Sequence, residues 1–215
     1  SSNNFLKSLI PSTKLKPTLF CFLFVNEFFI VVCSFHEVSN NSSDSTQEEK
    51  KSIEEVSDLA LSLSDFPNSS GWEISTRGEI TNNEVNEYYK ELGWVDGYEI
   101  IFRKIDSKDV QVVHSSSRYP LENISLVLEP IKYQLERFNK YSTDYNKNIY
   151  GKYRYQELSE PNLGEDSVAY KLVYIEDDAE DVYYIEFVKA TYYEYVGGYD
   201  YELVKELAKK AEILI

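Results

Sequence analysis

Histidine is scarce in this chain, so an acid–base centre would have few imidazole groups to use. Only two of the 215 residues are histidine, and His36 lies outside the region expected to fold. His114 stands between Val113 and Ser115, in a run that predicts a strand. Because a strand turns alternate side chains to opposite faces, Ser115–Ser117 cannot all lie beside His114. We therefore predict that His114 is a half-exposed packing residue and not a general base.

Carboxylates are the other candidate catalytic groups, but no pattern selects a pair among the 37 acidic residues. A carboxylate-based hydrolase is an alternative, and it would require a concave pocket that holds His114 and a carboxylate. The sequence contains no nucleophile elbow, zinc-protease helix, phosphate-binding loop or dinucleotide fingerprint. The acidic tract Glu176–Asp181 lacks the spacing and the glycine of a calcium loop, so we expect an exposed turn. We predict no enzymatic activity, no cofactor and no metal.

Tyrosine is the residue type that most suggests a recognition surface. Most of the 19 tyrosines fall between Tyr141 and Tyr201, and adjacent pairs within a strand must place one ring on each face. Exposed rings beside acidic groups suit a sugar, a peptide or a cation, whereas half-buried strand tyrosines need no ligand. The residues predicted to bind a ligand are Tyr183, Tyr184, Tyr192, Tyr193 and Tyr195.

The charge of the chain limits the kinds of partner. The formal net charge is −15, and residues 1–36 contribute +2, which leaves −17 for the rest. A body this acidic repels phosphate backbones and anionic lipid surfaces, so we predict that it binds no nucleic acid. The expected partner is an unidentified small molecule, glycan or protein.

The first 52 residues differ in composition from the rest. Lysines precede an apolar stretch within residues 1–33, which predicts a secretory signal or a membrane anchor, with a buried core helix as the alternative. Cys33 at its end is a candidate lipidation site, although the preceding Val32 departs from the small residue that such sites favour. Residues 34–52 form a polar tract too poor in apolar side chains to order itself. We therefore expect an exported, membrane-tethered protein whose single folded domain spans residues 53–215.

The last third of the chain predicts three strands closed by one helix. The strands are rich in β-branched and aromatic residues, and Asp200 has the chemistry of a helix N-cap. From Asp200 onward, apolar residues recur at helical spacing, which predicts a helix packed on the sheet. The expected strands are Ser167–Ile175, Val182–Val188 and Thr191–Val196.

Earlier segments alternate between helical and strand patterns. A capping box at Thr81–Glu84 predicts a helix that ends at Gly93, and Pro130 should kink a longer helix. The other expected helices are Ile53–Leu63 and Leu121–Tyr141, and the other expected strands are Trp72–Ile80, Trp94–Lys104, Val110–Tyr119 and Lys152–Gln156.

The order of these elements, roughly αβαββαββββα, and several local motifs together resemble a known group of proteins. The motifs are Gly71-Trp72-Glu73, Gly93 to Tyr98, Tyr119-Pro120, Leu163 to Ser167 and Glu206 to Glu212. They resemble uncharacterised secreted and lipoprotein-type domains of archaea and bacteria, similar to the Mog1/PsbP-like α+β fold. The resemblance implies an antiparallel β-sheet flanked by helices and no enzymatic activity. The function expected is a binding or accessory role at the cell envelope, with a structural surface component as a further alternative.

Overall fold

The computed structural model describes residues 55–140, 153–159, 161–174 and 180–215. The predicted signal or anchor segment with Cys33, the polar tract and most of the acidic turn lie outside the described residues. No helix within the described ranges is long and apolar enough to cross a membrane.

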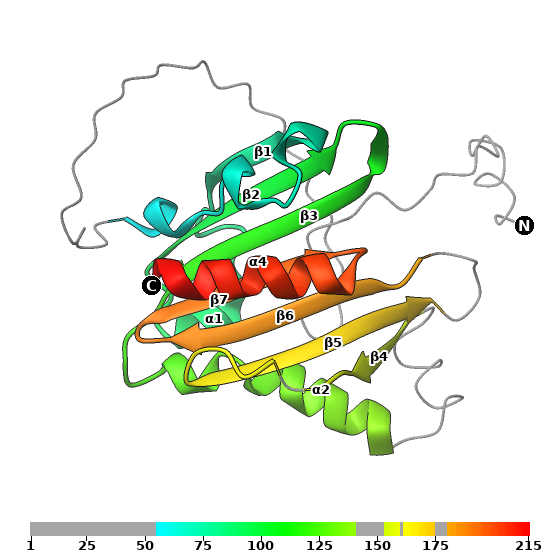
Figure 1. Ribbon diagram of the computed structural model, residues 1–215. Helices are drawn as coiled ribbons and strands as arrows, with labels where there is room; N and C mark the ends of the chain where they lie inside the picture. The colour runs from blue at the N-terminus through cyan, green and yellow to red at the C-terminus, as the bar shows by residue number, and fades with distance from the viewer. Residues whose placement is uncertain (1–54, 141–152, 160, 175–179) are drawn as a thin grey trace, which may run out of the picture.

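A seven-stranded antiparallel sheet forms the centre of the domain, in the order β1-β2-β3-β7-β6-β5-β4 (Figure 1). This order places β3 beside β7, although about 80 residues separate their paired positions, such as Ser116 and Glu194. The α+β fold class predicted from the sequence is confirmed. The strands are β1 (Trp72–Glu79), β2 (Asp96–Lys104), β3 (Ser107–Arg118), β4 (Tyr153–Glu157), β5 (Asp166–Tyr174), β6 (Val182–Lys189) and β7 (Tyr192–Gly198).

Helices cover both faces of the sheet. The helix α4 (Tyr201–Leu214) packs on one face, whereas α1 (Glu87–Glu91) and α2 (Glu129–Lys140) lie on the opposite face (Figure 1). Each face therefore has its own apolar core, and side chains that alternate along the central strands belong to different cores.

The closing unit of the chain has the predicted structure. Asp200 Oδ1 accepts hydrogen bonds from the backbone amides of Glu202, at 3.0 Å, and of Leu203, at 3.2 Å. These bonds satisfy two of the free amides at the start of α4. The predicted apolar stripe is confirmed in its middle, although Leu214 at its end is exposed; the buried residues of α4 are Val204, Leu207, Ala208 and Ala211.

The helix predicted at Ile53–Leu63 is not formed in its described part. In its place are 3-10 turns at Val56–Leu59 and Leu63–Asp65. The Ser62 amide and hydroxyl donate to Asp65 Oδ2 at 2.7 and 2.8 Å, so a short polar side chain competes with helical bonding.

The two helices expected in the middle of the chain begin later than predicted. Thr81 and Glu84 do bond to each other, but α1 starts one turn further on, where Asn86 Oδ1 caps the amide of Tyr88 at 2.7 Å. The kink predicted at Pro130 is wrong, because Pro130 lies in the first turn of α2. Proline fits there, since an amide in the first turn has no partner within the helix.

Candidate functional site

A buried polar cluster, formed by His114, Ser116 and Glu194, lies on the α4 face of the sheet. Ser116 and Glu194 are paired across β3 and β7, and His114 is two residues from Ser116 and so points to the same face. The side chains of His114 and Glu194 are 1% and 0% exposed. The half-exposed position predicted for His114 is therefore wrong.

The hydrogen bonds of the polar cluster determine where its protons lie. The backbone amide of Leu61 donates to His114 Nδ1 at 3.2 Å, so the proton of the neutral imidazole is on Nε2. That Nε2–H donates to Glu194 Oε2 at 2.7 Å, and the Ser116 hydroxyl donates to the same oxygen at 2.7 Å. Glu194 Oε1 is buried without a hydrogen-bond partner. Burial raises the pKa of the Glu194 carboxyl, and the bonds from His114 and Ser116 partly oppose that rise.

This geometry is unlike that of a nucleophilic triad. In a triad the hydroxyl bonds to the imidazole, whereas here the Ser116 hydroxyl bonds to the carboxylate and both ring nitrogens of His114 have other partners. Because the cluster is buried, a substrate has no access to it in this conformation. The hydrolase alternative requires a pocket that holds His114, and His114 does not line the groove described below.

A second buried carboxylate lies on the opposite face of the sheet. Glu186 accepts hydrogen bonds from the hydroxyls of Tyr170, at 2.6 Å, and Tyr193, at 2.9 Å. Burial raises the pKa of the Glu186 carboxyl despite these two bonds. Burial and the neighbouring Glu186 charge together raise the pKa of both tyrosine hydroxyls.

The tyrosines predicted to bind a ligand do not form an exposed face. Tyr184, Tyr192 and Tyr195 are buried. Tyr183 is half-buried beside Tyr201, with ring centroids 5.6 Å apart, and Tyr193 is half-buried and bonds to Glu186. The expectation of an open tyrosine surface is wrong because helices cover both sides of the sheet.

Sequence reasoning did not single out Glu186 or Glu194. The signal that could have found them is a charged residue inside an apolar central strand, because a buried charge is costly and needs partners. Both glutamates are flanked by large apolar or aromatic residues in the sequence.

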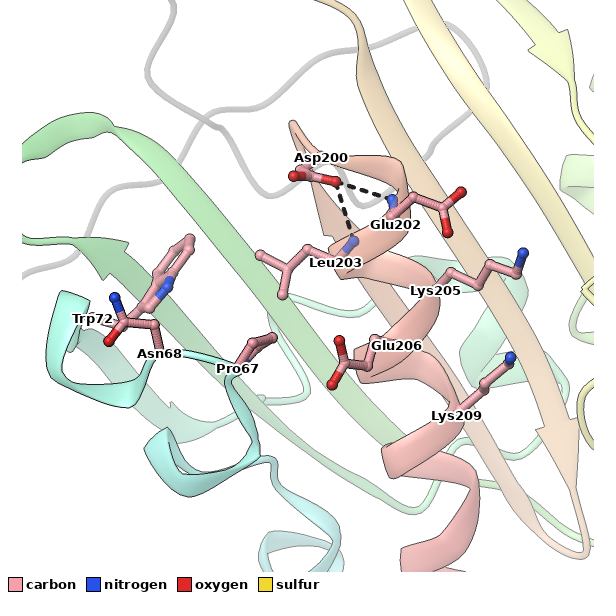
Figure 2. Close-up of a pocket in the computed structure, with 9 residues that line it drawn as sticks. All are labelled: Pro67, Asn68, Trp72, Asp200, Glu202, Leu203, Lys205, Glu206 and Lys209. Atoms are coloured by element: carbon pink, nitrogen blue, oxygen red, sulfur yellow. Dashed lines mark hydrogen bonds between the residues drawn. The ribbon is translucent and has the colours of Figure 1, made fainter.

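An open groove of about 480 Å³ lies between the N-terminal part of α4 and the chain entering β1. Figure 2 shows Leu203 and Glu206 pointing from α4 toward Trp72 and Pro67, whereas Lys205 and Lys209 point away. The groove is lined by Pro67, Asn68, Trp72, Asp200, Glu202, Leu203, Lys205, Glu206 and Lys209.

The groove combines an apolar wall with polar groups that can form hydrogen bonds. Trp72 and Leu203 supply apolar surface, while the Asn68 amide and the Glu206 carboxylate supply donors and acceptors. Glu206 is also paired with Lys210, at 3.3 Å. A concave site with an aromatic wall and a few polar groups suits a small organic ligand. The described residues contain no group of three or more metal-ligating side chains.

Comparison with known proteins gives a likeness at the level of the fold. The sequence matches no protein-family profile and no curated protein. The structure is similar to the extracellular domain of PknH from Mycobacterium tuberculosis. The TM-score is 0.52 at 12% sequence identity, over 77% of this chain and 96% of that domain.

This likeness extends over nearly the whole PknH domain, so it concerns the complete architecture and not one supersecondary unit. It supports the α+β assignment independently of the strand and helix patterns. The finer resemblance to the Mog1/PsbP-like fold stays a prediction.

Proposed function

We propose that this chain is an extracytoplasmic binding domain whose ligand site is the groove beside α4. The observation that carries the proposal is the fold shared with an extracellular domain, over 96% of that domain's length. The apolar segment within residues 1–33 is consistent with export and with attachment to a membrane, either directly or through a lipid on Cys33.

The polar chemistry of the described residues favours binding over catalysis. The imidazole that could act as a base is buried and fully bonded, whereas the groove is open to solvent and carries no histidine, serine or cysteine. The net charge of −15 favours neutral or cationic ligands over nucleic acids. Trp72 gives the groove a face on which a sugar ring, or an apolar side chain of a peptide, can pack.

Binding can be tested with arrays of oligosaccharides and of short peptides, probed with the purified chain. We expect retention on one of the arrays, and its loss in Trp72→Ala, because the indole forms the apolar wall of the groove. Tyr133→Ala is the matched control, because it removes an exposed aromatic side chain from α2, on the opposite face of the sheet and outside the groove. Equal retention of wild type and Trp72→Ala would place the binding surface elsewhere and contradict the assignment of the groove.

A further inference from the structure

The segment of residues 55–66, called the strap below, crosses the α4 face of the sheet and leads directly into one wall of the groove. Its 3-10 turn at Val56–Leu59 contacts β2, β3 and α4, and Pro67 and Asn68 of the groove directly follow the strap in the sequence. Its buried side chains are Val56, Leu59, Leu61 and Phe66.

The strap is fixed to the sheet by a hydrogen bond between distant parts of the sequence. The Leu61 amide lies beyond the 3-10 turn at Val56–Leu59 and is bonded to no backbone carbonyl; its acceptor is the buried Nδ1 of His114, 53 residues away. A buried amide without an acceptor is costly, so this bond favours one position of the strap. To accept the bond from Leu61, Nδ1 must carry no proton. In the neutral imidazole the proton then lies on Nε2, which donates it to Glu194, and this second bond favours the same tautomer.

Contacts continue from the strap into the groove. The ring of Phe66 packs against Trp72 and Phe102, with centroids 4.8 and 4.7 Å apart. On the other side, Lys210 of α4 donates to the backbone carbonyl of Asp65 and pairs with Glu206 of the groove. The strap therefore touches both walls of the groove, through Trp72 and through α4.

We propose that His114 is a positioning residue for the groove: by bonding the Leu61 amide it holds the strap, and with it the Pro67–Trp72 wall, against α4. The proposal rests on the function proposed for the groove, but it concerns the position of the wall and can be measured without a ligand. The buried polar cluster then has a structural role, which agrees with its lack of access to solvent.

A matched pair of substitutions separates the two sides of the imidazole. The side-chain oxygen of asparagine can occupy the position of Nδ1, whereas the amide nitrogen of glutamine can occupy that of Nε2. His114→Asn therefore retains the acceptor for Leu61, and His114→Gln retains only the donor to Glu194. If His114 were needed only to fill space, both variants would show the same exchange rate of the Leu61 amide and the same accessibility of Trp72.

The measurements are hydrogen exchange of the Leu61 amide and acrylamide quenching of Trp72 in a Trp94→Phe background. In His114→Gln we expect the Leu61 amide to exchange about tenfold faster or more, relative to amides of β6, and Trp72 to become more accessible to acrylamide. In His114→Asn both should stay near the wild-type values. Equal behaviour of the two variants, or a strap unchanged in His114→Gln, would overturn the proposal. A groove that binds no ligand would affect neither readout, so the two proposals can fail separately.

If the His114 variants do not fold, the same bond can be tested from the strap. Leu61→Pro removes the amide proton, and Ala60, at φ −66° and ψ 130°, has a backbone conformation that a following proline allows. Leu61→Ala keeps the amide and removes the side chain. Greater acrylamide quenching of Trp72 in Leu61→Pro than in Leu61→Ala supports the proposal, and equal quenching contradicts it.

Discussion

Stability should fall as pH rises above the unfolded pKa of a glutamate carboxyl, because the domain buries Glu194 in an environment that disfavours its charge. Glu194 is fully buried, and its Oε1 has no partner. Burial raises the pKa of this carboxyl above its unfolded value. A raised pKa means that the folded state holds the proton more tightly than the unfolded state. The resulting stabilisation is fully present below the unfolded pKa and is lost as pH rises through the folded pKa.

The size of the effect follows from the number of protons involved. One carboxyl exchanges at most one proton, so it contributes at most about 1.4 kcal/mol of unfolding free energy per pH unit between its two pKa values. Glu194→Gln keeps the size and an acceptor oxygen for His114 and Ser116 while it removes the titration. The difference in unfolding free energy between wild type and Glu194→Gln should therefore shift in favour of the variant as pH rises.

The assay is urea-induced unfolding of both proteins in steps from pH 5 to pH 8. Comparing the two proteins cancels most of the effect of the general negative charge, which also changes with pH. The exposed Glu202→Gln on α4 is the control and should run parallel to wild type. Parallel curves for wild type and Glu194→Gln across the whole range would refute the reasoning.

Two backbone features give further predictions. Asp200→Ala removes the acceptor for the first amides of α4 and should lower the unfolding free energy by about 1 kcal/mol, measured by urea unfolding; an unchanged value would show that the cap does not matter. Gly164→Ala should destabilise the domain enough to lower its melting temperature, because Gly164 has φ +59° and an added Cβ would lie 2.1 Å from the carbonyl oxygen of Val188. Calorimetry that shows an unchanged melting temperature for Gly164→Ala would contradict this backbone geometry.

Elements specified by nearby residues could be predicted from the sequence. The strands from β5 to β7 have dense β-branched and aromatic runs, and Asp200 caps α4 through its own following amides. Gly93 ends the segment after α1 with φ +84°, as its left-handed preference predicts. These signals do not depend on how distant segments pair.

The features that escaped prediction depend on distant contacts. His114 is buried because β3 pairs with β7, which brings Glu194 and Ser116 to the same face. The strap is not helical because its apolar residues pack on the sheet and its polar residues bond locally. Likewise, the groove joins residues near the start of the domain to α4 at its end, a proximity that no local pattern encodes.

Exposure of the groove outside the cytoplasm is the central claim, and labelling in intact cells tests it most directly. The full-length native chain with Glu202→Cys would be treated with a membrane-impermeant maleimide, with the unsubstituted chain as the background control for Cys21 and Cys33. The exposed side chain of residue 202 lies on the groove helix, so an extracytoplasmic domain predicts additional labelling of intact cells. Additional labelling that appears only after the cells are lysed would contradict it.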